Sequence, residues 1–478
     1  MKRIVTLLLA AGLVLGAAAG SQAADIKAKG TWDFMVQFGD QSALKHDGQD
    51  TMSAMQRLRT QVDVIASESL KGVMFFEIGS TNWGQSNQGG ALGTDGRQVE
   101  VRYSYIDWVI PQTEVKVRVG LQNFTLPNFV AGSAILGGGA ADGAGITIAG
   151  DFTENVGASL FWLRAENDNV GYDSKKDYKA SDAFDVVGLT VPLTFDGVKV
   201  TPWGMFSMIG KDSLDGNHAD SRDQIGTLRT GLTPIGMTSF SGSKDRNGNA
   251  WWLGLGGELT MFNPVRVAVD AAYGSADMGE NGARINGKEM DLKRSGWYAS
   301  IIGEYKLDFM TPGLLFWYAS GDDNDYYNGS ERLPTIRGSW SASSYGFDGN
   351  YYDSNCDVIG LTPVGTMAVF AQIKDISFLE DLSHVFRAGY IKGTNNTEMA
   401  RHGYGVTPFS TSEGLYLTTG DSAIEVNFDT EYKIYKDLTL FVELGYINLD
   451  LGDTWKQAQK DSVRENNFRG AVNLEYKF

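Results

Sequence analysis

One stretch decides the fold: Phe468-Arg469-Gly470-Ala471-Val472-Asn473-Leu474-Glu475-Tyr476-Lys477-Phe478, in which apolar or small residues alternate with polar ones. A transmembrane β-strand needs about 9–11 residues because it crosses the bilayer at a tilt. The alternation predicts one face toward lipid and one toward water, and the lipid-facing set is Phe468, Val472, Leu474, Tyr476 and Phe478. The stretch therefore predicts the closing strand of an outer-membrane barrel.

The first residues have the features of a secretory signal peptide. The basic residues Lys2 and Arg3 precede an apolar run, and Ser21-Gln22-Ala23 fits a small-x-small cleavage site. We expect residues 1–23 to be removed from the mature protein. We expect residues 24–478 to form a single transmembrane barrel domain in the outer membrane of a Gram-negative bacterium.

The chain is acidic and rich in glycine and aromatic residues. Its formal net charge is −17, and removal of the predicted signal peptide leaves 39 basic against 58 acidic residues, a net charge of −19. This charge excludes a general nucleic-acid binder, which would be basic. The 59 Gly, 24 Phe, 20 Tyr and 11 Trp against 10 Pro fit many strands joined by tight turns. Cys356 is the only cysteine, so no intrachain disulfide is possible.

Segments with a period of two residues recur along the chain and predict antiparallel strands. Short turns alternate with long polar loops, as in transmembrane barrels with periplasmic turns and extracellular loops. The long loops are expected at residues 39–54, 81–97, 124–144, 166–183, 210–248, 277–293, 321–363, 396–420 and 453–466. With eight short turns, these nine loops predict an all-β, up-and-down antiparallel barrel of eighteen strands, and sixteen strands is the alternative.

Basic side chains cluster on one part of the predicted lumen wall. If the apolar faces point outward, Arg57, Arg59, Arg102, Lys116 and Arg118 point inward from neighbouring strands. One interpretation is that lumen positions are simply polar and some happen to be arginine. The other is that these cations form one wall of a constriction, since the local field in a pore controls which ions enter. The second interpretation predicts a pore more tolerant of anions than the net charge suggests.

The loop at residues 124–144 follows these strands. Its apolar run at residues 126–132 and its three glycines at residues 137–139 are unusual for a solvated loop, so we expect it to fold inward as the constriction. Asp142 is its only carboxylate and is a candidate to oppose the basic wall, with an ordinary solvated aspartate as the alternative. A separate acidic set lies near the C-terminus, on strands that closure brings close to the first strand: Glu425, Asp429, Glu431 and Glu443.

Several short runs resemble the outer membrane homotrimeric porin family of sulfate-reducing bacteria and, more loosely, general trimeric porins. They are Gln56-Arg57-Leu58-Arg59, Glu77-Ile78-Gly79 with Trp83-Gly84, Tyr103-Ser104-Tyr105-Ile106-Asp107-Trp108, Gly120-Leu121-Gln122 with Leu126-Pro127, and Phe161-Trp162-Leu163-Arg164. The resemblance implies a homotrimer of water-filled channels that pass small hydrophilic solutes and ions by passive diffusion. It also implies that the third loop folds against the arginines of the early strands. The chain departs from that pattern in having few acids in this loop.

Two roles follow from the resemblance alone. The final strand with Tyr476 and Phe478 is similar to the signal that barrel-assembly machinery reads, and its alternative is a plain closing strand. Asn82-Trp83-Gly84 is similar to the latch that reaches a neighbouring subunit, and its alternative is an ordinary glycine-rich loop. The expected partners are therefore other copies of this chain, the assembly machinery, and outer-membrane lipid with lipopolysaccharide.

Two rival functions remain open. A substrate-selective channel would be favoured by eighteen strands and by inward aromatics such as Trp252 or Trp317, although packing in the wall is the commoner role of such residues. An outer-membrane enzyme is poorly supported, since the sequence has only four histidines and no Gly-x-Ser-x-Gly or His-x-x-x-His motif. We expect no catalytic residues, no cofactor and no resident metal. The acidic run Asp322-Asp323-Asn324-Asp325 could bind Ca²⁺, but an ordinary solvated loop is the stronger interpretation.

Overall fold

The computed structural model describes residues 24–40, 44, 51–93, 99–138, 141–167, 183–210, 213–214, 225–234, 247–285, 288–325, 327–347, 362–402, 406–410 and 414–478. The predicted signal peptide and Cys356 lie outside these residues. Among the described residues, no helix is both long and apolar enough to cross a bilayer.

The described part of the chain consists almost entirely of strands. The strands are β1 Asp25–Gly39, β2 Thr51–Ser67, β3 Leu70–Asn82, β4 Val99–Val109, β5 Lys116–Asn123, β6 Asp142–Thr153, β7 Val156–Asn167, β8 Ala183–Thr190, β9 Leu193–Phe195, β10 Val198–Ile209, β11 Gly248–Leu259, β12 Val265–Ile285, β13 Lys288–Tyr305, β14 Thr311–Ala319, β15 Thr366–Leu379, β16 Leu382–Gly393, β17 Phe409–Ser410, β18 Gly414–Leu415, β19 Ser422–Tyr435, β20 Leu438–Asp450 and β21 Asn466–Lys477. The helices are short and are η2 Ser86–Gln88, α2 Ile225–Leu232, α3 Thr397–His402 and α4 Gln457–Lys460.

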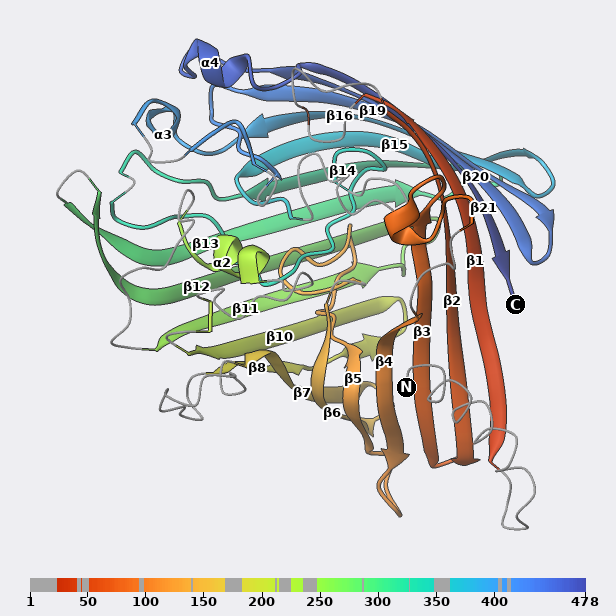
Figure 1. Ribbon diagram of the computed structural model, residues 1–478. Coiled ribbons are helices and arrows are strands. Elements are labelled where there is room, and N and C mark those ends of the chain that lie inside the picture. Colours follow the sequence, from red (N-terminus) through yellow and green to blue (C-terminus); the bar gives the residue numbers. More distant parts are fainter. Residues whose placement is uncertain are drawn as a thin grey trace.

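The main sheet closes on itself as an antiparallel barrel (Figure 1). It contains nineteen named strands, but β8 and β9 both pair with β7 and β10 and form one interrupted strand, which leaves eighteen staves. Pro192 lies in the interruption, where its missing N–H cannot serve the ladder. The predicted eighteen-strand barrel is confirmed, and the sixteen-strand alternative is wrong.

The seam joins the two ends of the described chain. β1 pairs antiparallel with β21, with Trp32 opposite Tyr476 and Val36 opposite Val472. The backbone N–H of Phe478 donates to the Gly30 carbonyl, and the Gly30 N–H donates to the Phe478 carbonyl. The predicted closing role of the final strand is therefore confirmed.

The alternation of the strands separates an apolar exterior from a polar interior. Leu58 lies opposite Trp32 and faces outward, while Arg57 lies opposite Asp33 and faces inward. Large apolar side chains are exposed all round the outside, for example Phe206, Phe316 and Tyr446. Because backbone polar groups in lipid must all be paired, a closed sheet with this exterior suits a bilayer.

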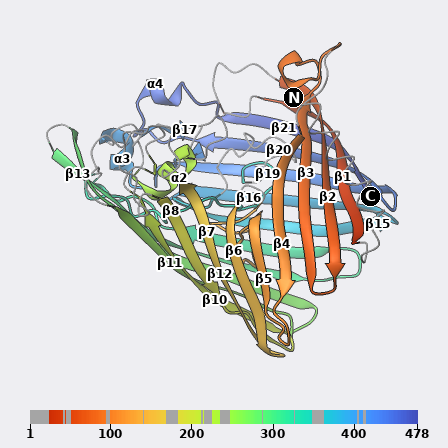
Figure 2. The same cartoon turned by 60° about the horizontal axis from the view of Figure 1, so that its bottom comes forward.

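One predicted loop is wrong. Residues 277–293 were expected to form a loop because they are polar, but β12 and β13 continue through them as a long hairpin. Met278, Met290 and Leu292 are buried at inward positions, so the period of two persists and the hairpin packs against the interior. Helices α3 and α4 lie at the end of the barrel that carries the long loops, away from the short turns (Figure 2).

Three segments from the long loops fold into the barrel and pack together. They are residues 124–138, residues 225–234 with helix α2, and residues 330–347, and we call them the interior body. Buried apolar residues of the interior body, including Leu126, Ile135 and Trp340, pack against inward residues of β10 to β15. The interior body therefore fills the side of the lumen next to these strands.

Candidate functional site in the lumen

A chain of ion pairs crosses the inner wall formed by β2, β3 and β4. The Arg59 guanidinium donates to Glu77 at 2.7 Å, and Arg102 reaches the same carboxylate at 3.4 Å. Arg102 Nε also donates to Asp142 Oδ2 at 2.9 Å. Asp142 accepts in addition from the Asn123 side chain, which donates to the Gly138 carbonyl as well. Arg102 and Asp142 therefore hold the base of the inward loop, and Asp142 lies beside the arginines rather than across from them.

The remaining predicted cations lie on the same wall. Arg57 Nε is 4.0 Å from Asp33 Oδ2, and both side chains are buried. Arg118 donates to both oxygens of Asp107, at 2.7 and 2.9 Å, and its guanidinium carbon lies 4.1 Å from the centre of the Tyr105 ring. Lys116 is exposed at the short-turn end of β5.

Sequence reasoning missed the carboxylates that accompany these cations. Each lies directly opposite its arginine in the antiparallel ladder: Asp33 opposite Arg57, Glu77 opposite Arg59, and Asp107 opposite Arg118. The wall is thus an alternating set of positive and negative groups and carries little net charge. Aligning the inward positions of adjacent strands from their turns would have revealed the pairing.

The inward loop is tethered to the opposite wall by two side chains of β12. The buried carboxylate of Asp270 accepts from the backbone N–H groups of Phe129 and Val130, at 2.9 and 2.8 Å. Arg266 donates to the Phe129 carbonyl at 2.8 Å, and it also pairs with Glu304 at 2.8 Å. These bonds hold the tip of the loop across the lumen.

The third segment of the interior body runs beside this loop. Backbone N–H groups of Ile336, Ser339 and Ser341 donate to carbonyls of Ile135, Ser133 and Ala131. This segment is also fastened to the wall, since Trp252 Nε1 donates to the Pro334 carbonyl and Arg294 donates to the Leu333 carbonyl. The two loop segments therefore form one continuous structure inside the barrel.

The aromatic residues considered for a selective channel do not face the water of the lumen. Trp252 and Trp317 are fully buried beneath the interior body. Trp317 stacks on Phe370 with ring centres 5.5 Å apart, and its Nε1 donates to Thr366. Both residues pack the wall, so they offer no surface for stacking a sugar.

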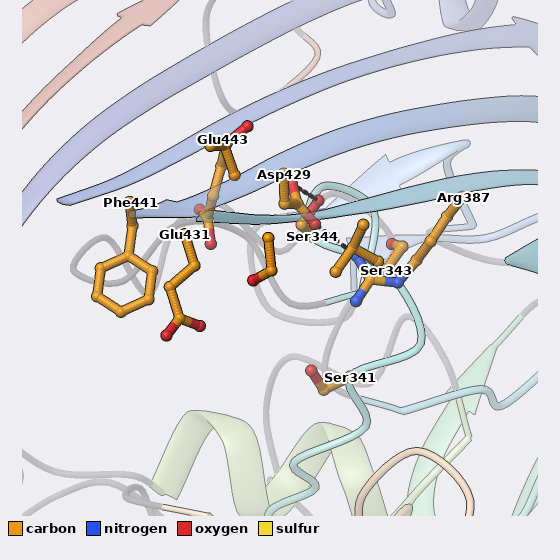
Figure 3. Close-up of a pocket in the computed structure, with 11 residues that line it drawn as sticks. Ser341, Ser343, Ser344, Arg387, Asp429, Glu431, Phe441 and Glu443 are labelled. Carbon is orange, nitrogen blue, oxygen red and sulfur yellow. Dashed lines mark hydrogen bonds and ion pairs between the residues drawn. The ribbon is translucent and has the colours of Figure 1, made fainter. Parts of the chain in front are cut away.

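A pocket of about 250 Å³ lies between the interior body and the wall of β16, β19 and β20 (Figure 3). We call it the serine–carboxylate pocket, and its lining includes Ser341, Ser343, Ser344, Ser383, Arg387, Asp429, Glu431, Phe441 and Glu443. Arg387 pairs with Asp429 at 2.5 Å, and Ser344 donates to the same carboxylate at 2.8 Å. Glu425 lies outside the pocket and is fully buried, where it accepts from the Gly346 N–H and from Asn427.

The acidic loop at residues 322–325 uses its carboxylates for internal hydrogen bonds. Asp322 accepts from Ser330 and from the Tyr416 hydroxyl, at 2.5 and 2.6 Å. Asp323 accepts from the Asp325 N–H, and Glu331 accepts from the Asp323 N–H. Burial raises the pKa of the Glu331 carboxyl. In the part of the chain that the structure describes, no three carboxylate, imidazole or thiol side chains converge as a metal site.

No family model matches the sequence, and no curated protein matches it. Solved structures nevertheless match over nearly the whole chain. OprD from Pseudomonas aeruginosa is 12% identical with a TM-score of 0.52, and the match covers 97% of this chain and 96% of that one. A BenF-like porin from Pseudomonas fluorescens Pf-5 is 9% identical with a TM-score of 0.52, and the match covers 95% and 98%. The fold is that of an outer-membrane porin.

A third similar structure is OccK2 from Pseudomonas aeruginosa in complex with glucuronate. It is 10% identical to this chain, with a TM-score of 0.51, and the match covers 95% of this chain and 98% of that one. At these identities the likeness concerns the fold, while the side chains of the lumen are particular to this chain.

Proposed function

We propose that this chain is an outer-membrane porin, a water-filled channel through which small hydrophilic solutes and ions diffuse passively. The observation that carries the proposal is a row of water-accessible charged side chains on the inner wall. Arg59, Lys71 and Arg118 are 28%, 37% and 31% exposed there, from the level of the interior body to the short-turn end. Side chains with this exposure inside a closed barrel require water beside them.

Within this proposal, the predicted residues line the narrow part of the channel. Arg57, Arg59, Arg102, Arg118 and Asp142 form one side, and the interior body forms the other side. Lys116 faces the exit at the short-turn end. The pairing of the arginines with carboxylates supports a channel with weak selectivity between cations and anions, because a close ion pair produces little field at a distance.

We further propose that three copies assemble as in the porins of sulfate-reducing bacteria that the sequence resembles. The loop after β3 supports this, because Trp83 and Leu92 are exposed on it, with Trp83 at 54%. Figure 2 shows this loop beside η2, extending from the barrel beyond β3. We also propose lipopolysaccharide contacts and recognition of Tyr476 and Phe478 by the assembly machinery.

A substrate-selective channel is the second candidate. Eighteen strands favour it, and OccK2, which shares the fold, has been crystallised with glucuronate. Its selectivity would arise from polar subsites at the wall, since Trp252 and Trp317 are covered. A barrel enzyme would instead show hydrolysis of lipid or peptide by the purified protein, and we expect none.

Planar-bilayer recording with purified protein tests the function. We expect conductance steps that appear in threes, and liposome swelling that falls smoothly as the size of neutral solutes increases. Swelling with one solute but not with others of equal size would favour the selective channel. Absence of any conductance from correctly folded protein would refute the porin proposal.

A further inference from the structure

The serine–carboxylate pocket has an excess of negative charge at its wall. Asp429 on β19 and Glu443 on β20 are direct partners in the antiparallel register, and Glu431 follows Asp429 on the same face. Like charges that lie directly opposite each other destabilise a sheet. Arg387 is the single guanidinium of the pocket and is already engaged with Asp429. A bound cation would relieve the repulsion that remains.

The pocket can be reached from the lumen and has room for an organic molecule. Ser341 is exposed, and the Glu431 side chain is 41% exposed. In Figure 3, Glu431 and Phe441 extend from the strands toward the side on which Ser341 lies. The volume of about 250 Å³ is several times the ~30 Å³ of a water molecule. The Lys433 ammonium lies 3.7 Å from Glu431, but both side chains are largely exposed, so this pair is weak.

The chemistry of the lining matches one class of solute. Carboxylates and serine hydroxyls accept the hydrogen bonds that an ammonium donates. The Phe441 ring offers its face to the same positive charge. We propose that the serine–carboxylate pocket is a binding subsite for small organic ammonium ions on their way through the channel. A linear diamine is the best probe, because its two charges can meet Glu431 and Glu443 together.

This subsite rests on the proposed porin function and specifies a class of solute that the channel favours. Its test is the block of single-channel current by 1,4-diaminobutane, compared with the neutral, equally long 1,4-butanediol. We expect the diamine to interrupt the current at millimolar concentrations and the diol to have no effect. In the double variant Glu431→Gln, Glu443→Gln, we expect block to require about tenfold more diamine.

Control variants separate the subsite from a general effect of charge. Asp450→Asn removes one carboxylate at the far end of β20, outside the pocket, and should leave the block unchanged. Glu431→Gln alone changes an exposed side chain, so it should fold even if the double variant does not, and it should weaken the block severalfold.

Each other outcome would overturn the subsite. Equal effects of diamine and diol would remove the preference for cations. Equal block by Mg²⁺ at the same concentration would mean that any cation suffices. Equal loss of block in Asp450→Asn would assign the effect to the overall field. A wild-type protein that conducts but is not blocked refutes only the subsite, whereas a protein that does not conduct refutes the porin function itself.

Discussion

The carboxylate partner of each lumen arginine decides how much that arginine affects passing ions. Arg118 makes two hydrogen bonds to Asp107, so the pair acts as a dipole and not as an isolated positive charge. The field of a dipole decreases with distance more steeply than that of a charge, and salt screens what remains. An arginine in this wall therefore acts mainly on solutes that touch it.

Removal of one partner should expose the charge of the other. We expect Arg118→Gln to shift the reversal potential in a tenfold KCl gradient toward cation preference, by roughly 5–15 mV of the ~59 mV limit for a monovalent ion. Asp107→Asn should shift it in the opposite direction, because Arg118 is then unbalanced. The measurement is reversal potential on single trimers.

The double variant Arg118→Gln, Asp107→Asn is the matched control. It removes both charges, so its reversal potential should return close to that of the wild type. If both single variants leave the reversal potential unchanged, this pair does not line the conducting path. A shift in the double variant as large as in Arg118→Gln would mean that the two charges act independently.

At the level of single residues, the sequence predicted position better than environment. The period of two placed Arg57, Arg59 and Arg118 on the inner face. Their carboxylate partners depend on the register between strands, which the turns fix and which composition does not display. The predicted opposition of Asp142 to the basic wall differs from the structure for the same reason, since Asn123 and Arg102 hold Asp142 on the arginine side.

The inward loop is an element whose position depends on very few polar contacts with the far wall. Asp270 accepts two of its backbone N–H groups, and Arg266 donates to one of its carbonyls. The free energy of hydrogen bonds to a charged group is about 1.5–3 kcal/mol when they are buried. Loss of the carboxylate leaves two N–H groups without their acceptor, so the tip of the loop should move.

We therefore expect Asp270→Ala to widen the channel. Single-channel conductance should rise by roughly a quarter to a half, with a larger size limit in liposome swelling, and the unfolding midpoint should fall because buried hydrogen bonds are lost. Asp270→Asn keeps one acceptor oxygen and should give an intermediate conductance. An Asp270→Ala channel with wild-type conductance would show that apolar packing alone holds the loop.

Strands were easier to predict than the long loops because a strand has a local period. The exception is the hairpin of β12 and β13, whose polar residues 277–293 concealed inward methionines. The third segment of the interior body, residues 330–347, could not be predicted, because its partner is a loop about two hundred residues earlier in the chain. No local pattern encodes a contact of that separation.

At the scale of the whole molecule, the exposed loop after β3 is the part suited to joining subunits. Trp83 is exposed, although its Nε1 donates to Gln56 at 3.1 Å, and Leu92 is fully exposed. A neighbouring subunit that covered these side chains would gain about 25 cal/mol for each Å² of apolar surface removed from water.

We expect the double variant Trp83→Ala, Leu92→Ser to lower the temperature at which the trimer dissociates, by about 10 °C or more, while each barrel remains folded. Semi-native gel electrophoresis after stepwise heating measures both events. Phe152→Ala is the control, because Phe152 is 75% exposed at the short-turn end, away from this loop. Identical dissociation temperatures for all three proteins would argue against the latch.

The architecture of the whole molecule followed from the sequence to a large extent. Turn and loop rhythm predicted a closed barrel with eighteen strands, because parity and closure leave few alternatives. The filling of one side of the lumen did not follow, since it arises from three loops that meet only after the barrel has formed.

The seam between β1 and β21 has a consequence for how the protein is made. Synthesis delivers β1 first and β21 last, so one edge of β1 has no partner until the chain is nearly complete. An open edge in lipid costs several kcal/mol for each unpaired backbone group. A ribosome that stops early therefore produces a chain that cannot settle in the membrane as a leaking fragment. Closure by the final residues makes every channel that reaches the membrane a channel of full length.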